Sequence, residues 1–483
     1  MLKKCLSALT LAALATWNLS AQDAPNAIAA ASKAMGVDTL KTVQYSATGF
    51  DFALGQAPNP SSPWPKFIEK SYLRSVDFEK PASRVDRVRM QGENPPRGGG
   101  QQPIIGEQTQ IQTIVVAADT PWAQQLEIWM LPQGFLRAAA ARNATAESKT
   151  VNGKKFTVIS FTGDNKAKVN GYVNAQNVVE RVETWIDHPV VGDMPFEAIY
   201  SDYKTVDGVQ FPMHIVQKQG GYPIYDLTVG DVKVNAPVTI QPQGRGGAAP
   251  APAAAAAAAA TSEKLGDGVY LITGGYAMIA VDFKDHIAVV ESGNSEQRAL
   301  AAIDEIKRVI PNKPIKYLIN THAHFDHSSG LRTFVAEGAT ILTHQVNKAY
   351  LEKVLAHPHT LNPDKQEQAK KKVMVEAVGE KKVLTDGVHT MELHHLTNFL
   401  HHDGMLIVYF PKEKVLLEAD GYNPQAANAT PPTPASPYTT SLVDNIRRLN
   451  LDVQRIVPVH YPADNRVVTM TELTKWAGRS STH

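Results

Sequence analysis

The chain has only one cysteine, Cys5, among its 483 residues. Cys5 lies in an apolar run after the basic start Met1–Lys4, a pattern that predicts a secretory signal peptide, residues 1–21, cleaved after Ala21. A lipoprotein anchor is disfavoured, because Cys5 precedes most of the apolar run instead of following it. The mature chain would lack cysteine, which excludes a disulfide framework even though a periplasmic or secreted location would permit one.

An excess of charge of either sign is also missing. Lysine and arginine number 48 against 47 aspartates and glutamates, which leaves a formal net charge of +1. No electrostatic footprint therefore indicates a nucleic-acid partner or an anionic membrane surface. Beyond the predicted leader, no apolar run is long enough to span a bilayer, so no stable membrane span is expected in the mature protein. No pattern in the sequence indicates an oligomeric state.

Histidine, alanine, proline and glycine are unevenly distributed along the chain. Fourteen of its 16 histidines lie beyond residue 263. Residues 241–262 are rich in alanine, proline and glycine and are predicted to form a loose or semi-rigid linker. The sequence therefore predicts two domains, residues 22–240 and residues 263–483.

The first predicted domain is rich in strand patterns. Short alternating runs such as 156–161, 178–185 and 225–229 are separated by Gly, Asn and Asp, which favours an antiparallel sheet. Asp207-Gly208 is typical of a hairpin turn. The order of elements resembles the curved half-barrel of periplasmic lipoprotein-carrier proteins. Such a sheet could shelter an acyl chain or shape an active-site mouth; no catalytic constellation is found in it.

One short segment concentrates metal-binding side chains, since residues 322–327 are His-Ala-His-Phe-Asp-His. Three imidazoles and a carboxylate within six residues suit Zn²⁺ or a similar first-row metal. The apolar run 314–319 before the motif is typical of a buried strand, and residues 331–337 after it are helix-like. The side chains would therefore converge at the carboxyl end of a strand. The segment predicts a metal site in preference to a solvated histidine-rich loop.

The His-x-His-x-Asp-His pattern after a strand resembles the motif of the metallo-β-lactamase superfamily, and the resemblance covers roughly residues 263–478. It implies an α/β fold, an αββα sandwich of two mixed sheets with helices outside, preceded here by the antiparallel β-rich domain. It also implies ligands at the ends of later strands. Asp420 ends the run 414–419, where the family often has a metal-bridging aspartate. His460 ends the run 455–459, where the family has its last histidine.

The family's third histidine has no unique match, because the usual Gly-His-Thr is missing. The candidates are His394, His395, His401 and His402. Residues 391–396 and 404–410 are strand-like, so the ligand should come from the connecting loop, residues 397–403. This position disfavours the first two histidines, which are interpreted as packing or outer residues.

His401 and His402 are adjacent, so their side chains should point apart and only one can face a metal. The resemblance favours His401. Family members with a Pro-Lys-Glu-Lys turn like residues 411–414 carry their ligand three residues before the glycine that matches Gly404.

The resemblance implies a dinuclear centre of two zinc ions per chain, with iron or manganese as alternatives. One ion would be held by His322, His324 and His401, the other by Asp326, His327 and His460, with Asp420 bridging them. Each site would keep a position open for solvent, as catalytic sites do. A hydroxide shared by the ions would attack at neutral pH, and Asp326 would be the catalytic residue that orients it and passes on its proton.

The chain is therefore predicted to be an exported metal-dependent hydrolase that cleaves an ester, thioester, lactone or related amide bond of a small molecule. Without cysteine it cannot use the cysteine ligand of several family β-lactamases. Alternatives are β-lactamase or phosphodiesterase activity, or an iron-dependent sulfur-oxidising member, which could leave Asp326 and His327 unused. Glu291, where the family usually has an aspartate behind the site, would hydrogen-bond a ligand imidazole or serve as a local cap. Fold alone does not select the substrate.

Overall fold

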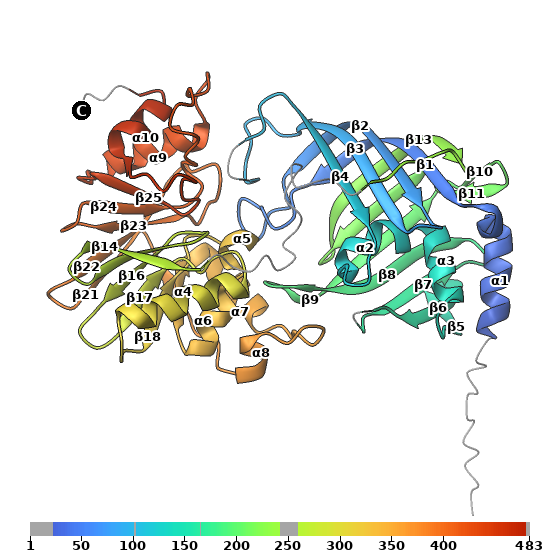
Figure 1. The fold of residues 1–483 in the computed structure, drawn as a ribbon, viewed down its shortest axis with the longest axis horizontal. Coiled ribbons are helices and arrows are strands. Elements are labelled where there is room, and N and C mark those ends of the chain that lie inside the picture. Colours follow the sequence, from blue (N-terminus) through green and yellow to red (C-terminus); the bar gives the residue numbers. More distant parts are fainter. Residues whose placement is uncertain (1–22, 101–102, 165, 242–258, 480–483) are drawn as a thin grey trace, which may run out of the picture.

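The computed structural model describes residues 23–100, 103–164, 166–241 and 259–479. The predicted signal peptide, residues 1–21, lies outside the described residues, as do residues 242–258 of the predicted linker. None of the helices in the described ranges is long and apolar enough to cross a membrane. Figure 1 shows an N-terminal lobe, coloured blue to green, beside a C-terminal lobe, coloured yellow to red.

The N-terminal lobe is built on one 11-stranded antiparallel sheet, which confirms the predicted β-rich character. The strands lie in the order β4-β3-β2-β1-β13-β12-β9-β8-β7-β6-β5. Their bounds are β1 (Thr42–Phe52), β2 (Lys66–Asp77), β3 (Ala82–Gln91), β4 (Glu107–Val115), β5 (Thr145–Val151), β6 (Lys154–Thr162), β7 (Lys168–Val173), β8 (Val179–His188), β9 (Gly192–Ser201), β12 (His214–Gln219) and β13 (Tyr222–Val234). Alternating burial along β1 and β9 places every second side chain in the core, as a half-buried strand requires.

Helices cover one face of this curved sheet (Figure 1). They are α1 (Ala24–Met35), the 3₁₀ turn η1 (Val37–Thr39), α2 (Trp122–Trp129) and α3 (Pro132–Ala140). Trp122 and Phe135 of these helices are buried in the same apolar core as Val182 of the sheet. The predicted hairpin is present as β10 (Lys204–Val206) and β11 (Val209–Phe211). Its turn residues Asp207 and Gly208 have φ of 46° and 81°, the left-handed values that a tight hairpin turn requires.

The C-terminal lobe contains two mixed sheets, as predicted. The first has the order β14-β15-β16-β17-β18-β19-β20 and the second β21-β22-β23-β24-β25-β26. The first comprises β14 (Thr261–Gly266), β15 (Val269–Thr273), β16 (Met278–Asp282), β17 (Ile287–Val290), β18 (Ile315–Ile319), β19 (Thr340–His344) and β20 (Val375–Val378). The second comprises β21 (Lys381–Thr385), β22 (Thr390–His395), β23 (Leu406–Phe410), β24 (Val415–Glu418), β25 (Arg455–Pro458) and β26 (Val468–Thr469). The strands expected before the histidine motif and before Asp420 are thus β18 and β24.

Three apolar clusters give this lobe its layers. The first sheet packs on one side against the helices α4 (Glu296–Val309), α5 (Phe325–Ser328), α6 (Leu331–Glu337) and α7 (Gln345–Leu355), and α8 (Lys365–Ala369) packs against α6. A second cluster lies between the sheets and joins residues such as Val290 and Leu417. The third packs the second sheet against α9 (Pro437–Arg448) and α10 (Met470–Trp476). This order of layers is the αββα sandwich.

Candidate metal centre

The segments that carry the predicted ligands all follow strands and meet at one edge of the sandwich. Residues 322–327 follow β18 of the first sheet and run into α5. His401 lies in the loop between β22 and β23, Asp420 follows β24 and His460 follows β25. Because β24 and β25 are parallel, Asp420 and His460 emerge at the same end of the second sheet.

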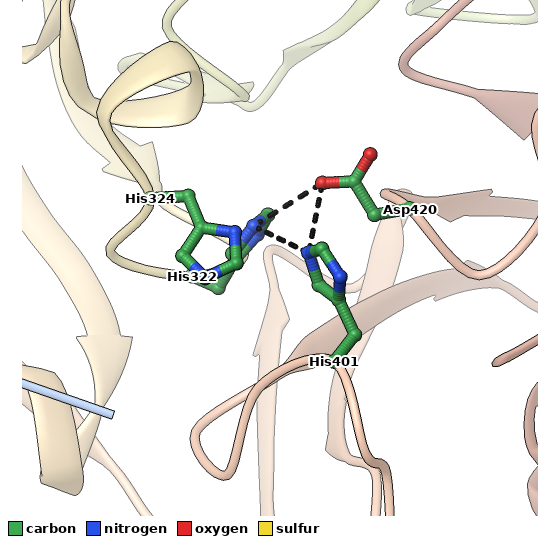
Figure 2. A group of neighbouring side chains, drawn as sticks. All are labelled: His322, His324, His401 and Asp420. Carbon is green, nitrogen blue, oxygen red and sulfur yellow. Dashed lines mark hydrogen bonds and ion pairs between the residues drawn. The ribbon is translucent and has the colours of Figure 1, made fainter. Parts of the chain in front are cut away.

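His322, His324, His401 and Asp420 form the first group, and one ligand atom from each lies within 4.8 Å of the others. Figure 2 shows these side chains pointing toward one another from three segments. The Asp420 Oδ2 atom is 3.3 Å from Nε2 of His322 and 3.1 Å from Nε2 of His401. All four residues are buried. This donor set has the composition of a transition-metal site.

Asp326, His327, Asp420 and His460 form the second group, again with ligand atoms within 4.8 Å. His327 Nε2 is 2.9 Å from Oδ2 of Asp420, and His460 Nε2 is 2.8 Å from Oδ1 of the same carboxylate. Asp326 Oδ2 is 3.4 Å from His327 Nε2. The Asp420 carboxylate therefore belongs to both groups, which is the geometry expected of a bridging ligand.

Glu291 orients two of the imidazoles from behind. Its Oε1 accepts from the Thr321 hydroxyl at 2.5 Å, and that hydroxyl lies 3.0 Å from Nδ1 of His322. Its Oε2 is 3.0 Å from Nδ1 of His327. With each Nδ1–H donated outward, Nε2 of both rings carries the lone pair that faces the centre. Glu291 also accepts from the Thr321 backbone N–H, so it fills both roles expected for it.

His324 presents its other ring nitrogen. Its Nε2 lies 2.9 Å from the carbonyl oxygen of Ala57, so Nε2–H donates and the lone pair resides on Nδ1. That Nδ1 is buried and has no hydrogen-bond partner. A buried acceptor without a partner costs free energy unless something fills the position, and a cation shared with His322 and His401 would do so. The residues present therefore fit a metal ion.

Burial keeps two histidines of the first group, His322 and His324, in the neutral form that binds metals. Burial, together with the neighbouring His327, lowers the pKa of His322 to about 4. Burial and the adjacent His322 lower the pKa of His324 well below its usual value. Neutral imidazoles are the ligand form, so protonation does not compete with metal binding at neutral pH for these two residues.

The two groups differ in access to solvent. The His322 and His401 side chains have no exposed surface, whereas 10% of His460 and 28% of Asp326 are exposed. Asp326 and His460 therefore form the side of the centre that is accessible to solvent. Tyr276 stands on this side, because its hydroxyl donates to Oδ2 of Asp326 at 3.0 Å and its ring lies 4.6 Å from that of His460.

Among the four candidate histidines, the structure places only His401 in the centre. The neighbouring His402 is excluded from both groups, and its Nδ1 accepts from the Gly404 N–H at 3.0 Å. His394 pairs with Glu392 and His395 stacks on His344 at a ring separation of 4.0 Å. Both strand histidines therefore lie outside the two ligand groups, and His395 is also within 2.9 Å of the Asp403 carbonyl oxygen.

Sequence reasoning missed Tyr276, Gln56 and Ala57. Tyr276 lies in a Gly-Gly-Tyr turn before β16. Gln56 lies in the loop between β1 and β2, and its Nε2 donates to Oδ1 of Asp326 at a distance of 2.9 Å. Neither residue belongs to a motif. A second unpredicted feature is the backbone of Asp420 and Glu291, which have left-handed φ of 56° and 74°. Such conformations are uncommon outside glycine and concentrate at functional sites.

One family model and several solved structures are similar to part of this chain. Residues 273–460 match the model of the metallo-beta-lactamase superfamily. Similar solved structures include a metallo-beta-lactamase from Pontibacter korlensis, at 17% identity and a TM-score of 0.34, covering 45% of this chain and 97% of that one. The DIM-1 and TMB-1 metallo-beta-lactamase structures show 14% and 15% identity with TM-scores of 0.34 and 0.33; each covers 45% of this chain and 95% of that chain. No curated protein matches.

Proposed function

Because residues 273–460 form a domain of the metallo-beta-lactamase superfamily, we propose that the chain is a metal-dependent hydrolase with two ions in its centre. The observation that carries this proposal is the position of Asp420. Its two carboxylate oxygens lie 2.8–3.3 Å from four imidazoles that belong to two ligand groups. A structural site would need one closed group of ligands, whereas two groups sharing an anion favour catalysis by paired ions.

The position of each side chain would determine which ion it binds. His322, His324 and His401 would hold one ion, and Asp326, His327 and His460 the other, with Asp420 shared. When bound, the ions would supply Lewis acidity, which activates water near neutral pH and polarises the scissile carbonyl. Asp326 is the most exposed of the seven ligands and is oriented by Tyr276 and Gln56. It would orient the attacking water and accept its proton.

We propose an ester, thioester, lactone or related amide of a small molecule as the substrate. The shared carboxylate stands where several β-lactamases of the family have a cysteine ligand, which favours these bonds over a β-lactam. Phosphodiester cleavage is the second candidate for the same reason. An iron-dependent sulfur oxidation is disfavoured, because Asp326 and His327 would have no function in a mononuclear site and yet are both oriented by hydrogen bonds.

Protein purified without added metal should contain about two zinc ions per chain, measured by elemental analysis. It should hydrolyse at least one of an aryl ester, a thioester, a homoserine lactone, a lactam and a bis-aryl phosphate. His324→Ala, made in parallel, should lose that activity and retain the circular dichroism spectrum of the parent. One iron per chain would support sulfur oxidation instead. Hydrolysis that survives complete removal of metal by a chelator would contradict the proposal.

Export to the periplasm or the medium belongs to the same proposal and is supported by the basic and apolar pattern of residues 1–21. Protein recovered from the periplasmic fraction should begin at Gln22, as determined by N-terminal sequencing. A chain that retains Met1 and stays in the cytoplasm would contradict export without affecting the proposed chemistry.

A further inference from the structure

The N-terminal lobe contributes three consecutive residues to the metal centre. In the loop between β1 and β2, residues 53–65, the Gly55 carbonyl accepts from the Phe325 N–H at 3.2 Å. The next residue, Gln56, donates from Nε2 to Oδ1 of Asp326 at 2.9 Å, and the Ala57 carbonyl accepts from Nε2 of His324 at 2.9 Å. This loop therefore contacts the histidine motif along its length, one residue after another.

Two of these contacts act on proposed metal ligands. The Ala57 carbonyl fixes the tautomer of His324, because a ring that donates from Nε2 must present its lone pair on Nδ1. Gln56 holds the carboxylate of Asp326 by the oxygen opposite to the one that faces His327. Outer hydrogen bonds of this kind orient ligands and raise metal affinity, and their loss typically costs about 10–100-fold in affinity or activity.

The loop is held rigidly enough to position ligands. At its root, Asp51 is buried and accepts from Arg89 at 2.5 Å and from Arg87 at 3.2 Å, while Arg87 also reaches Glu69 at 2.7 Å. These residues lie where β1 ends, where β2 begins and on the neighbouring β3. The Ala53 N–H to Pro65 carbonyl hydrogen bond closes the loop at 2.9 Å. A buried, paired charge network and the closing hydrogen bond fix the two ends of the loop.

A second loop clamps the first one onto the C-terminal lobe. The Gly99 N–H donates to the Gln56 carbonyl at 2.9 Å, and the neighbouring Gly98 N–H donates to the Leu400 carbonyl at 3.0 Å, next to His401. The Tyr438 hydroxyl donates to the Gly98 carbonyl at 2.7 Å. The loop that carries Gln56 is thereby tied to the loop that carries His401. The N-terminal lobe therefore contacts two of the three segments that carry the first group, residues 322–327 and the loop of His401.

We propose that Gln56 and the Ala57 carbonyl are positioning groups of the metal centre, so that the N-terminal lobe completes the active site of the C-terminal lobe. This inference rests on the proposed metal-dependent function. It assigns the antiparallel sheet a role in presenting the loop, residues 53–65, to the ligands. Of the two roles considered for that sheet, it favours shaping the active site over sheltering an acyl chain.

Gln56→Ala tests the side-chain contact. It should weaken binding of one of two zinc ions about 10-fold or more, because Asp326 loses one of its two orienting donors and keeps Tyr276. The measurement is zinc competition against a chromophoric chelator in the full-length protein, together with the absorption spectrum of the cobalt-substituted protein. Gln176→Ala is the matched control, because Gln176 is exposed in the turn between β7 and β8. It should leave both affinities and the spectrum unchanged.

Gly55→Ala tests the loop as a unit. Gly55 has a left-handed φ of 71°, and a Cβ atom there would lie 2.1 Å from the Phe325 ring, so the contact between the loop and the motif must shift. We expect both zinc affinities to fall, with the circular dichroism spectrum of the sheets retained. Unchanged affinities in both Gln56→Ala and Gly55→Ala would overturn the positioning role. A parent protein that binds no zinc would instead overturn the proposed function, so the two failures are distinguishable.

Discussion

Asp420→Ala should lower hydrolytic kcat/KM by more than 100-fold and yield protein that binds neither zinc ion tightly. Four imidazoles from both groups lie within 3.3 Å of the Asp420 carboxylate, so its removal takes the shared anion from both sites at once. Loss of a ligand should exceed the roughly 10–100-fold effect of losing an outer hydrogen bond. Zinc content after dialysis and kcat/KM on the best substrate of the panel measure the effect.

Asp420→Asn is the companion variant, because the left-handed φ of 56° at this position would strain alanine. Asparagine tolerates that backbone and keeps the volume of the side chain while it removes the charge. Both variants should lose metal, and the asparagine variant should keep the thermal unfolding midpoint of the metal-free parent. If both variants still bound two zinc ions tightly and hydrolysed the substrate as fast as the parent, the shared-ligand arrangement would be excluded.

His401→Ala should lose one of the two zinc ions on dialysis, together with at least 100-fold of kcat/KM, whereas His402→Ala should retain both ions. His401 Nε2 lies 3.1 Å from Asp420 Oδ2 and 3.4 Å from His322 Nε2. His402 instead accepts the Gly404 N–H and lies outside both ligand groups. The paired variants differ by one position in the same loop and so control for damage to it. If His402→Ala lost metal and His401→Ala did not, the assignment of this loop would be wrong.

The choice between His401 and His402 shows where local pattern stops being informative. Both residues lie in an irregular loop, and alternation along a strand does not extend into it. The sequence left two candidates and a preference taken from the family resemblance. The orientation of the loop is decided by its neighbours, since the Tyr438 ring packs 5.2 Å from that of His401 while the Gly404 N–H holds His402. Gly404 belongs to the same turn as His402, whereas Tyr438 comes from α9, which local sequence does not place beside this loop.

The sequence, through its resemblance to a known family, indicated the class of the centre and the sandwich that carries it. Short apolar runs indicated β18 and β24: every residue of β24 is buried, whereas β18 includes the exposed Lys316 among its apolar residues. The histidine motif placed three imidazoles and a carboxylate in one loop by covalent connection alone. Asp420 and His460 could be located because the family resemblance implies ligands just after these later strands.

Only the tertiary structure decided what surrounds those ligands. Gln56 and Ala57 lie 270 and 267 residues away from the side chains they contact, and nothing in their local sequence marks them. A backbone carbonyl is chemically the same at almost every position, so Ala57 can be identified only by where the chain carries it. Gln56 could not be identified for the same reason, because its amide contacts Asp326 only when the N-terminal sheet places its loop against the histidine motif. Ligand identity is a property of local sequence, whereas the hydrogen bonds that orient ligands depend on how distant segments pack.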